Sequence, residues 1–307
     1  MINLPQSVLQ ASAIFVSIII EAVPFVLFGC VITGFLQSFL DPAKVKQWLP
    51  KNKILAILTG MFLGFFFPSC ECGIVPIVKE LLKKGVPSYT AITFMLTAPI
   101  INPVVLFSTY IAFNNDSYPV FLRVLGSLVV AFIIGLWLAY RNKDTILKEE
   151  YKKEGLAPIH SEQCCGGGVS SRKKVSLIRK ISQALQHSVD EFFDTGRYLV
   201  IGALLAAVMQ TYLKTALLFP YASNKVTSIL IMMGFAFILS LCSEADAFIG
   251  TSMKSMFGLT PVIGFLVYGP MVDIKNLMMM SHHFTRKFML KLIGLVTLIV
   301  FIYTLLL

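Results

Sequence analysis

The chain repeats itself: the pattern of residues 1–120 returns in residues 173–290. A shift of 173 positions places Glu71 on Glu244 (244 − 71 = 173), and both acids interrupt segments that are otherwise apolar. The same shift pairs Glu21 with Asp194, Gly29 with Gly202, Gln37 with Gln210 and Leu40 with Leu213. Two related halves with interrupted hydrophobic segments at matching positions are typical of membrane transporters, and the interruptions point to the binding site.

The composition is that of an integral membrane protein. Of the 307 residues, 56% are hydrophobic and 14% are charged, whereas about a quarter of the residues of a soluble domain are charged. The net charge is +10, but ten of the 26 Lys and Arg residues lie between Arg141 and Lys180. Tyr151 is the one aromatic residue among them. This placement indicates a loop that stays on the inner side of the membrane, and it argues against a nucleic-acid partner.

Two of the apolar segments are too short to cross a bilayer. Ile54–Phe67 has 14 residues and Val226–Leu241 has 16, whereas a crossing helix needs roughly 20. The other apolar segments are Val8–Phe39, Tyr89–Phe113, Pro119–Tyr140, Arg197–Phe219, Pro261–Met280 and Phe288–Leu307. Each short segment runs into a cluster of cysteine and acidic residues, and a second short helical piece follows. We therefore predict a re-entrant hairpin in each half, with its tip deep in the membrane.

Loop charge predicts that the two halves are inverted. If Met1 lies outside and both hairpins return to their own side, the basic loop after Arg141 falls inside, and Asn114–Ser117, which has no basic residue, falls outside. Each half then crosses three times. The predicted fold is an all-α polytopic membrane protein of two inverted repeats, each with three crossings plus a re-entrant helical hairpin, about 8 to 10 membrane segments in all.

The predicted topology divides the chain into three regions: a first membrane repeat over 1–140, a flexible cytoplasmic linker over 141–175, and an amphipathic helix with the second membrane repeat over 176–307. The second repeat begins with apolar residues at helical spacing in Val175–Phe193. We expect this segment to be an amphipathic helix that lies on the inner surface and leads into the fifth span.

The first hairpin tip carries two thiols beside a carboxylate, Cys70, Glu71 and Cys72. In an extended turn both thiols would point the same way and could hold one ion, whereas in a helix they would point apart. Pro68 and Gly73 flank the cluster and favour the turn. The alternative is that the cysteines are only small residues suited to tight packing, although packing does not explain Glu71.

The second tip also combines a cysteine with acidic residues, but its set of donor groups differs. It supplies one thiol, one hydroxyl and two carboxylates, from Cys242, Ser243, Glu244 and Asp246. Inverted repeats would bring both tips together near the middle of the membrane. Such a set suits a thiophilic cation or metalloid with Cys70, Cys72 and Cys242 as its ligands, or proton coupling through the acids. The sequence leaves this choice open.

Further polar residues lie inside apolar segments. Asn102 and Asp273 each come three residues after a proline, where they would satisfy a freed carbonyl or contact a ligand. Glu21 lies well inside the first span and is a third candidate for substrate contact. Arg197 and Lys275 are candidate counter-charges, and Asp194 is expected to be interfacial.

We find no motif of an ATPase or a membrane metalloprotease, and none that calls for a cofactor. An enzyme with Cys70 as nucleophile would need a base, but no histidine stands near it in the apolar segments. Cys164 and Cys165, near His160, form a weak metal-binding pattern in the linker.

The two tip motifs and the proline-containing stretches resemble those of the bacterial predicted-permease family. The stretches are Pro68-Ser-Cys-Glu-Cys-Gly-Ile-Val-Pro76, Lys84-Gly-Val-Pro87, Leu96-Thr-Ala-Pro-Ile-Ile-Asn-Pro103, Leu239-Ser-Leu-Cys-Ser-Glu-Ala-Asp246 and Val272-Asp-Ile-Lys-Asn276. The resemblance covers nearly the whole chain apart from 141–175.

The resemblance implies a multi-pass permease of the bacterial plasma membrane. The family includes efflux permeases for trivalent organoarsenicals, whose membrane cysteines handle the thiophilic substrate, and that role would carry over to Cys70, Cys72 and Cys242. This sequence is more similar to members that work beside a second, partly extracellular subunit under zinc-responsive control. Similar members have a histidine-rich central loop, whereas this chain has Cys164–Gly168 there.

The sequence thus favours a secondary permease for a small metal- or metalloid-related solute, in the lipid bilayer, with a second subunit or a homodimer as candidate assemblies. A channel is a further alternative. The rival interpretation is a membrane subunit that does not transport and instead anchors or regulates a partner in a metal-responsive complex.

Overall fold

The computed structural model describes residues 6–39, 50–67, 70–141, 146–148, 177–212 and 224–307. These residues are almost entirely helical; the exception to the helices is a single bridge between Leu147 and Phe284. Within these described residues, five helices are long and apolar enough to cross a membrane. The predicted all-α polytopic class is confirmed, and Cys164, Cys165 and most of the predicted linker lie outside the described residues.

The described helices fall into two sets with the same order: one long helix, two short pairs, and a last long helix. The first half contains α1 (Gln6–Phe39), α3 (Lys53–Phe66), α4 (Glu71–Lys83), α5 (Ser88–Ile101), α6 (Pro103–Ala112) and α7 (Ser117–Tyr140). The second half contains α9 (Leu177–Tyr212), α10 (Lys225–Leu239), α11 (Ser243–Phe257), α12 (Leu259–Tyr268), α13 (Ile274–His283) and α14 (Arg286–Leu306).

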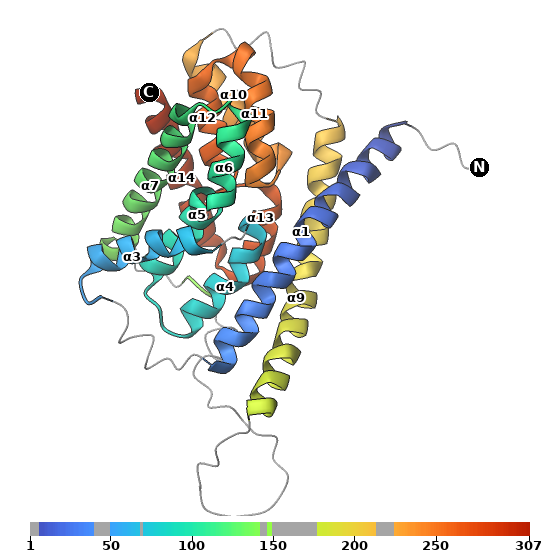
Figure 1. Ribbon diagram of the computed structural model, residues 1–307, viewed down its shortest axis with the longest axis vertical. Coiled ribbons are helices and arrows are strands. Elements are labelled where there is room, and N and C mark those ends of the chain that lie inside the picture. Colours follow the sequence, from blue (N-terminus) through green and yellow to red (C-terminus); the bar gives the residue numbers. More distant parts are fainter. Residues whose placement is uncertain (1–5, 40–49, 68–69, 142–145, 149–176, 213–223) are drawn as a thin grey trace, which may run out of the picture.

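Matching helices of the two halves run in opposite directions (Figure 1). The long helices α1 and α9 lie side by side and antiparallel, and α7 and α14 also run in opposite senses. The α3–α4 pair approaches the middle of the molecule from the lower end of Figure 1, and the α10–α11 pair approaches it from the upper end. This arrangement is that of an inverted repeat.

The helix starts correct the register of the repeat by one residue. α10 begins 172 positions after α3 (225 − 53), and α11 begins 172 positions after α4 (243 − 71). Cys70 and Cys242 are the N-cap residues of α4 and α11, both with extended backbone. Cys70 is therefore equivalent to Cys242, and Glu71 is equivalent to Ser243 rather than to Glu244 as the sequence match suggested.

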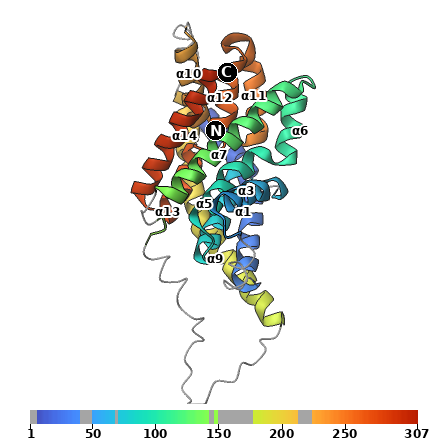
Figure 2. The same cartoon turned by 90° about the vertical axis from the view of Figure 1, so that its left-hand side faces the viewer.

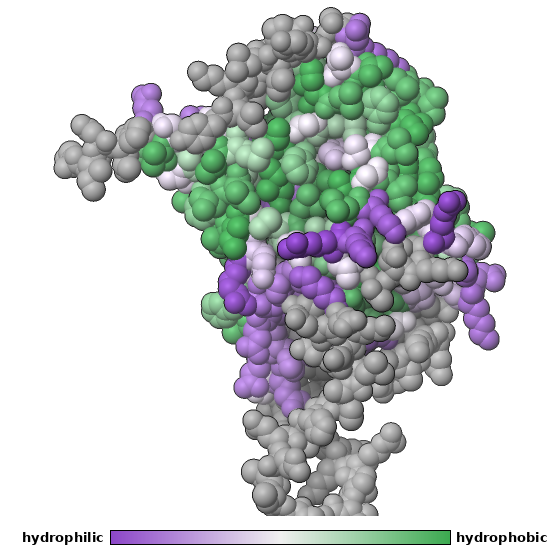
Figure 3. Space-filling model, turned by 180° about the vertical axis from the view of Figure 1, so that it is seen from behind, coloured by the Kyte–Doolittle hydropathy of each residue, from purple (hydrophilic) through white to green (hydrophobic). Residues whose placement is uncertain are grey.

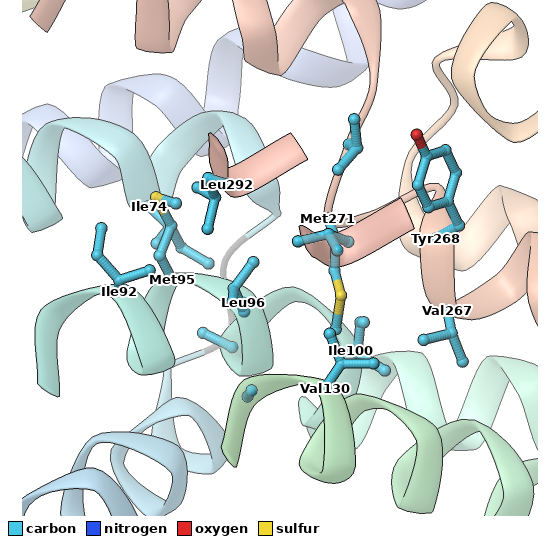
Figure 4. Packing of buried hydrophobic residues seen from close by; sticks show 14 of the residues in the cluster. Ile74, Ile92, Met95, Leu96, Ile100, Val130, Val267, Tyr268, Met271 and Leu292 are labelled. Atoms are coloured by element: carbon cyan, nitrogen blue, oxygen red, sulfur yellow. The ribbon is translucent and has the colours of Figure 1, made fainter. Parts of the chain in front are cut away.

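The second helix of each short pair packs against the other half. α4 contacts α13, and α11 contacts α6. A shared core joins the halves around these contacts: Met271 extends towards Ile100 of α5 and Val130 of α7 (Figure 4). The expected re-entrant position of these pairs in a bilayer remains a prediction.

The start of α9 packs against α1. The segment predicted over Val175–Phe193 is described from Leu177 and continues without interruption to Tyr212. Its early turns pack along α1, because Gly34 has no side chain and leaves room for the Ala184 carbonyl; a Cβ on Gly34 would lie 2.3 Å from that oxygen. This close approach holds the segment beside α1, and its expected position on the inner surface of the membrane remains a prediction.

The molecule is elongated, with the C-terminus and the start of α10 at one end and the first turns of α9 at the other (Figure 2). The face seen in Figure 3 is hydrophobic over its upper part, and hydrophilic residues gather across and below its middle. Exposed apolar residues include Ile20 of α1, Phe62 of α3, Leu204 of α9 and Leu290 of α14. Such a surface is suited to contact with lipid.

Candidate substrate site at the two cysteine-containing tips

The tips of the two short pairs meet inside the protein. The thiol of Cys70 shares hydrogen bonds with the thiols of Cys72 and Cys242. The Ser243 hydroxyl donates to Glu71 Oε2 at 3.5 Å. Both contacts between the tips join equivalent residues (242 − 70 = 172; 243 − 71 = 172). The axis that relates the halves therefore passes between the starts of α4 and α11.

All five of these side chains are buried, with 2% exposure or less. The expected extended turn over Cys70–Cys72 is wrong in part, because α4 begins at Glu71 and places Cys72 in its first turn. The thiols nevertheless stay within hydrogen-bonding distance, since Cys70 is an N-cap residue with extended backbone. Among the described residues, no group of three His, Cys, Asp or Glu side chains is arranged to hold a metal ion.

A buried lysine holds the first tip. Lys275 Nζ lies 3.0 Å from Glu71 Oε1 and 3.9 Å from Asp273 Oδ2, and all three side chains are about 1% exposed. Lys275 belongs to α13 of the second half, whereas Glu71 begins α4 of the first. The expected counter-charge role of Lys275 is confirmed.

A buried arginine, which the sequence analysis missed, holds the second tip. Arg123 of α7 is fully buried; its Nη2 donates to the Ser243 carbonyl at 2.9 Å and its Nη1 to Thr109 Oγ1 at 2.6 Å. The available signal was a lone arginine inside the apolar segment Pro119–Tyr140, since charged residues at membrane depth are functional by default. Each tip is thus held by a cation from the opposite half.

Asn102 and Asp273 begin helices at equivalent breaks (273 − 102 = 171). Asn102 Oδ1 accepts from the Val104 N–H at 3.0 Å, and Asp273 Oδ1 accepts from the Asn276 N–H. Both side chains are buried and act as N-caps of α6 and α13. These caps were not expected from the sequence, and the expected contact of either residue with a freed carbonyl or a ligand remains a prediction.

The remaining acids lie at different depths. Asp246 is buried in the first turn of α11, and its Oδ2 faces the backbone of Gly269, where a Cβ would lie 2.9 Å away. Asp246 and Glu244 both interact electrostatically with Arg123. Glu244 and Glu21 are only half-buried and repel each other across α11 and α1.

Asp194 takes no part in the tips. It pairs with Arg197 at 2.5 Å and lies 3.5 Å from His282 Nδ1. Its carboxylate and the Arg197 guanidinium are partly exposed, at 29% and 71%. This agrees with the interfacial position expected for Asp194.

Comparison with known proteins gives a family match over almost the whole chain. A protein-family model described as "Predicted permease" matches residues 7–307. The chain belongs to this family. No solved structure matches it.

Three curated relatives share this similarity. A protein of Streptococcus mutans named "Putative two-component membrane permease complex subunit" is 54% identical over 303 residues, covering 99% of this chain and 96% of its own. The Bacillus subtilis UPF0718 protein YcgR is 48% identical over 295 residues, covering 96% and 95%. The Methanocaldococcus jannaschii UPF0718 protein MJ0584 is 25% identical over 132 residues, covering 42% and 34%. The family and the apolar helices together make the chain a multi-pass permease of a bacterial membrane.

Proposed function

We propose that this permease is a secondary transporter that moves a small thiophilic metal or metalloid solute through the site between the two tips. The observation that carries the proposal is the meeting of Cys70, Cys72 and Cys242 in one buried place, with Glu71 beside them. Soft thiol ligands select soft metals and metalloids, and carboxylates at this depth are functional by default.

A neutral metalloid hydroxide fits this site better than a bare metal cation. When a thiol replaces a hydroxide on a trivalent metalloid, the S–H proton leaves with the hydroxide as water, so no new charge is buried. A metal cation would add its charge to the site and displace thiol protons, which nearby carboxylates would then have to accept. Because buried uncompensated charge is costly, the enclosed thiols favour the neutral exchange.

Uptake into inverted membrane vesicles tests the proposal, with arsenite, phenylarsine oxide, Zn²⁺ and Cd²⁺ as probes. We expect uptake of at least one probe by wild-type vesicles and its loss in Cys70→Ser and Cys72→Ser. Cys30→Ser is the matched control, because Cys30 is equally buried but lies on α1. Unchanged uptake in both tip variants would show that the thiols do not handle the solute.

The rival function is a membrane subunit without transport activity of its own, and the name of the Streptococcus mutans relative favours some form of complex. We propose that this chain also works with a second subunit. Vesicles that contain this chain alone, compared with vesicles that also contain the partner, separate the two functions. If Glu71→Gln lowers the amount of folded protein but leaves the activity of the complex unchanged, the acidic tip is structural and the rival is favoured.

A further inference from the structure

Asp246 has a buried carboxylate oxygen that nothing in the described part of the chain satisfies. Its side chain is 2% exposed, and its Oδ2 accepts no hydrogen bond. Arg123 attracts this carboxylate electrostatically, but the guanidinium donates to the Ser243 carbonyl and to Thr109 instead. A buried carboxylate oxygen without a donor is costly, so we looked for the positive group that it could take.

The Asp246 oxygen lies at the end of another helix. Its Oδ2 faces Gly269, the C-cap residue of α12, where a Cβ would lie 2.9 Å away. The C-terminal end of a helix carries the negative end of the helix dipole, which repels a carboxylate and attracts a cation. The chain then breaks and begins α13 at Asp273. The carboxylate is therefore directed to a position that suits a positive charge.

A second unsatisfied oxygen belongs to the same break. Asn276, in the first turn of α13, is 4% exposed, and its side-chain Oδ1 accepts no hydrogen bond. Its N–H donates to Asp273 Oδ1, and Asp273 in turn interacts electrostatically with Asp246. Lys275, at 3.9 Å, and Ser240 both act on the Asp273 carboxylate, which leaves the oxygens of Asp246 and Asn276 without a donor.

The enclosed charges allow one further cation. Three carboxylates, Glu71, Asp246 and Asp273, and two cations, Arg123 and Lys275, are each at most 2% exposed. With all five ionised, one negative charge is left over (3 − 2 = 1). Since the excess is a single charge, a monovalent ion balances it.

These oxygens are specific to the second half of the protein. The helix starts relate α11 to α4 by 172 positions and α13 to α6 by 171 (243 − 71; 274 − 103). By these shifts, Asp246, Asp273 and Asn276 correspond to Ile74, Asn102 and Val105. The equivalent break therefore forms with two apolar residues and no charge. Packing and capping do not explain why the second half has two acids and an amide there.

We propose that Asp246, Asn276 and Asp273 bind one hard monovalent cation, of which Na⁺ is the representative, at the break between α12 and α13. Carboxylate and amide oxygens are hard ligands, and the ends of broken helices coordinate Na⁺ in other transporters. A proton would serve one oxygen, whereas a metal ion coordinates several at once. The further role of coupling ion for transport rests on the proposed function.

Thermal unfolding of the purified full-length protein in detergent tests the site without any transported solute. A ligand that binds only the native state raises the unfolding temperature in a concentration-dependent way. At fixed pH, we expect NaCl to raise it and choline chloride of equal concentration not to do so. The Na⁺-specific rise should be lost in Asp246→Asn and Asn276→Ala. The matched control is Glu80→Gln, which should keep the rise, because Glu80 is also buried but interacts with Lys79, Lys83 and Lys84 of α4 and its end.

Three results would overturn the site: equal effects of NaCl and choline chloride on wild type, an unchanged Na⁺ effect in Asp246→Asn, or a stability that depends on pH but not on Na⁺. If Asp246→Asn does not fold, the wild-type titration and Asn276→Ala still decide.

Arsenite and Zn²⁺ uptake into proteoliposomes, driven by a Na⁺ gradient at constant pH, tests the coupling role. We expect the gradient to accelerate uptake in wild type and to have no effect in Asp246→Asn. If wild type takes up a probe at the same rate with and without the gradient, the coupling role is wrong and the proposed function stands. If wild type moves neither probe but shows the Na⁺-specific stabilisation, the proposed substrate class is wrong and the cation site stands.

Discussion

Cys70 and Cys242 cap equivalent helices in the two halves of the protein, and their thiols are hydrogen-bonded to each other. Contact between equivalent residues places the axis that relates the inverted halves between these two cysteines. The next residues along the chain, Glu71 and Ser243, repeat the relationship. The predictions below follow from what holds these four residues together.

Removal of the lysine at the first tip should destabilise the protein through Glu71. In Lys275→Met the Glu71 carboxylate stays buried and loses its partner, and such a change costs about 3–5 kcal/mol. The double variant Lys275→Met with Glu71→Gln should recover most of the loss, because no uncompensated charge remains on that pair. Thermal unfolding in detergent measures both. Equal stabilities of the single and double variants would show that the pair contributes nothing to folding.

The arginine at the second tip should be equally sensitive to substitution. Arg123→Met removes the donors to Ser243 and Thr109 and leaves Asp246 without the cation that attracts it most strongly, so we expect a loss of about 3–5 kcal/mol. Arg123→Lys keeps the charge but cannot donate in both directions, and its loss should be intermediate. A lysine variant as unstable as the methionine variant would show that geometry, rather than charge, carries the effect.

Two glycines matched by the repeat should not tolerate a side chain. A Cβ on Gly29 would lie 2.3 Å from the Gly73 oxygen of α4, and one on Gly202 would lie 2.9 Å from the Lys275 Cα of α13. Alanine at either position should push the helices apart and cost about 1–3 kcal/mol. The control is Gly196→Ala on α9, which meets no atom within 4 Å and should gain about 0.5–1 kcal/mol from its helical position. A loss at Gly196 as large as at Gly29 would argue against the close approach.

Substitutions at Asp273 should separate its cap from its charge. Asp273→Asn keeps an oxygen for the Asn276 N–H, as Asn102 does for Val104, and should retain the stability of wild type. Asp273→Ala removes the cap and should lose about 1 kcal/mol. Thermal unfolding of both variants in detergent checks this. If Asp273→Asn is as unstable as Asp273→Ala, the charge of Asp273 beside Lys275, rather than the cap, stabilises the protein.

Much of this architecture could be predicted from the sequence, because hydrophobic length and loop charge act locally. The short segments Ile54–Phe67 and Val226–Leu241 indicated the broken helices, and the matched acids indicated where the halves would meet. The predicted alignment of the two halves was shifted by one residue at the tips. The sequence match aligned Glu71 with Glu244, whereas the helix caps align it with Ser243.

Other features depend on tertiary contacts that no local pattern contains. In the sequence, Arg123 is a single charged residue inside an apolar segment. Only the packed structure shows that its guanidinium donates to the Ser243 carbonyl. The apolar spacing at the start of α9 indicates an amphipathic helix. It does not show that Gly34 allows this helix to pack on α1. The sequence analysis linked Asn102 and Asp273 to the prolines before them and did not predict that they cap helices. The sequence shows each proline but not where the next helix begins.

A cross-link between the two tips tests the central claim most directly. We would retain Cys70 and Cys242, change the other four cysteines to serine, place a protease site within 149–176, and oxidise the protein in its membrane before cleavage. Our account predicts that the halves then migrate together on a non-reducing gel, separate on reduction, and separate without reduction when either cysteine is also replaced. Halves that separate with both cysteines present and oxidised would contradict the meeting of the tips.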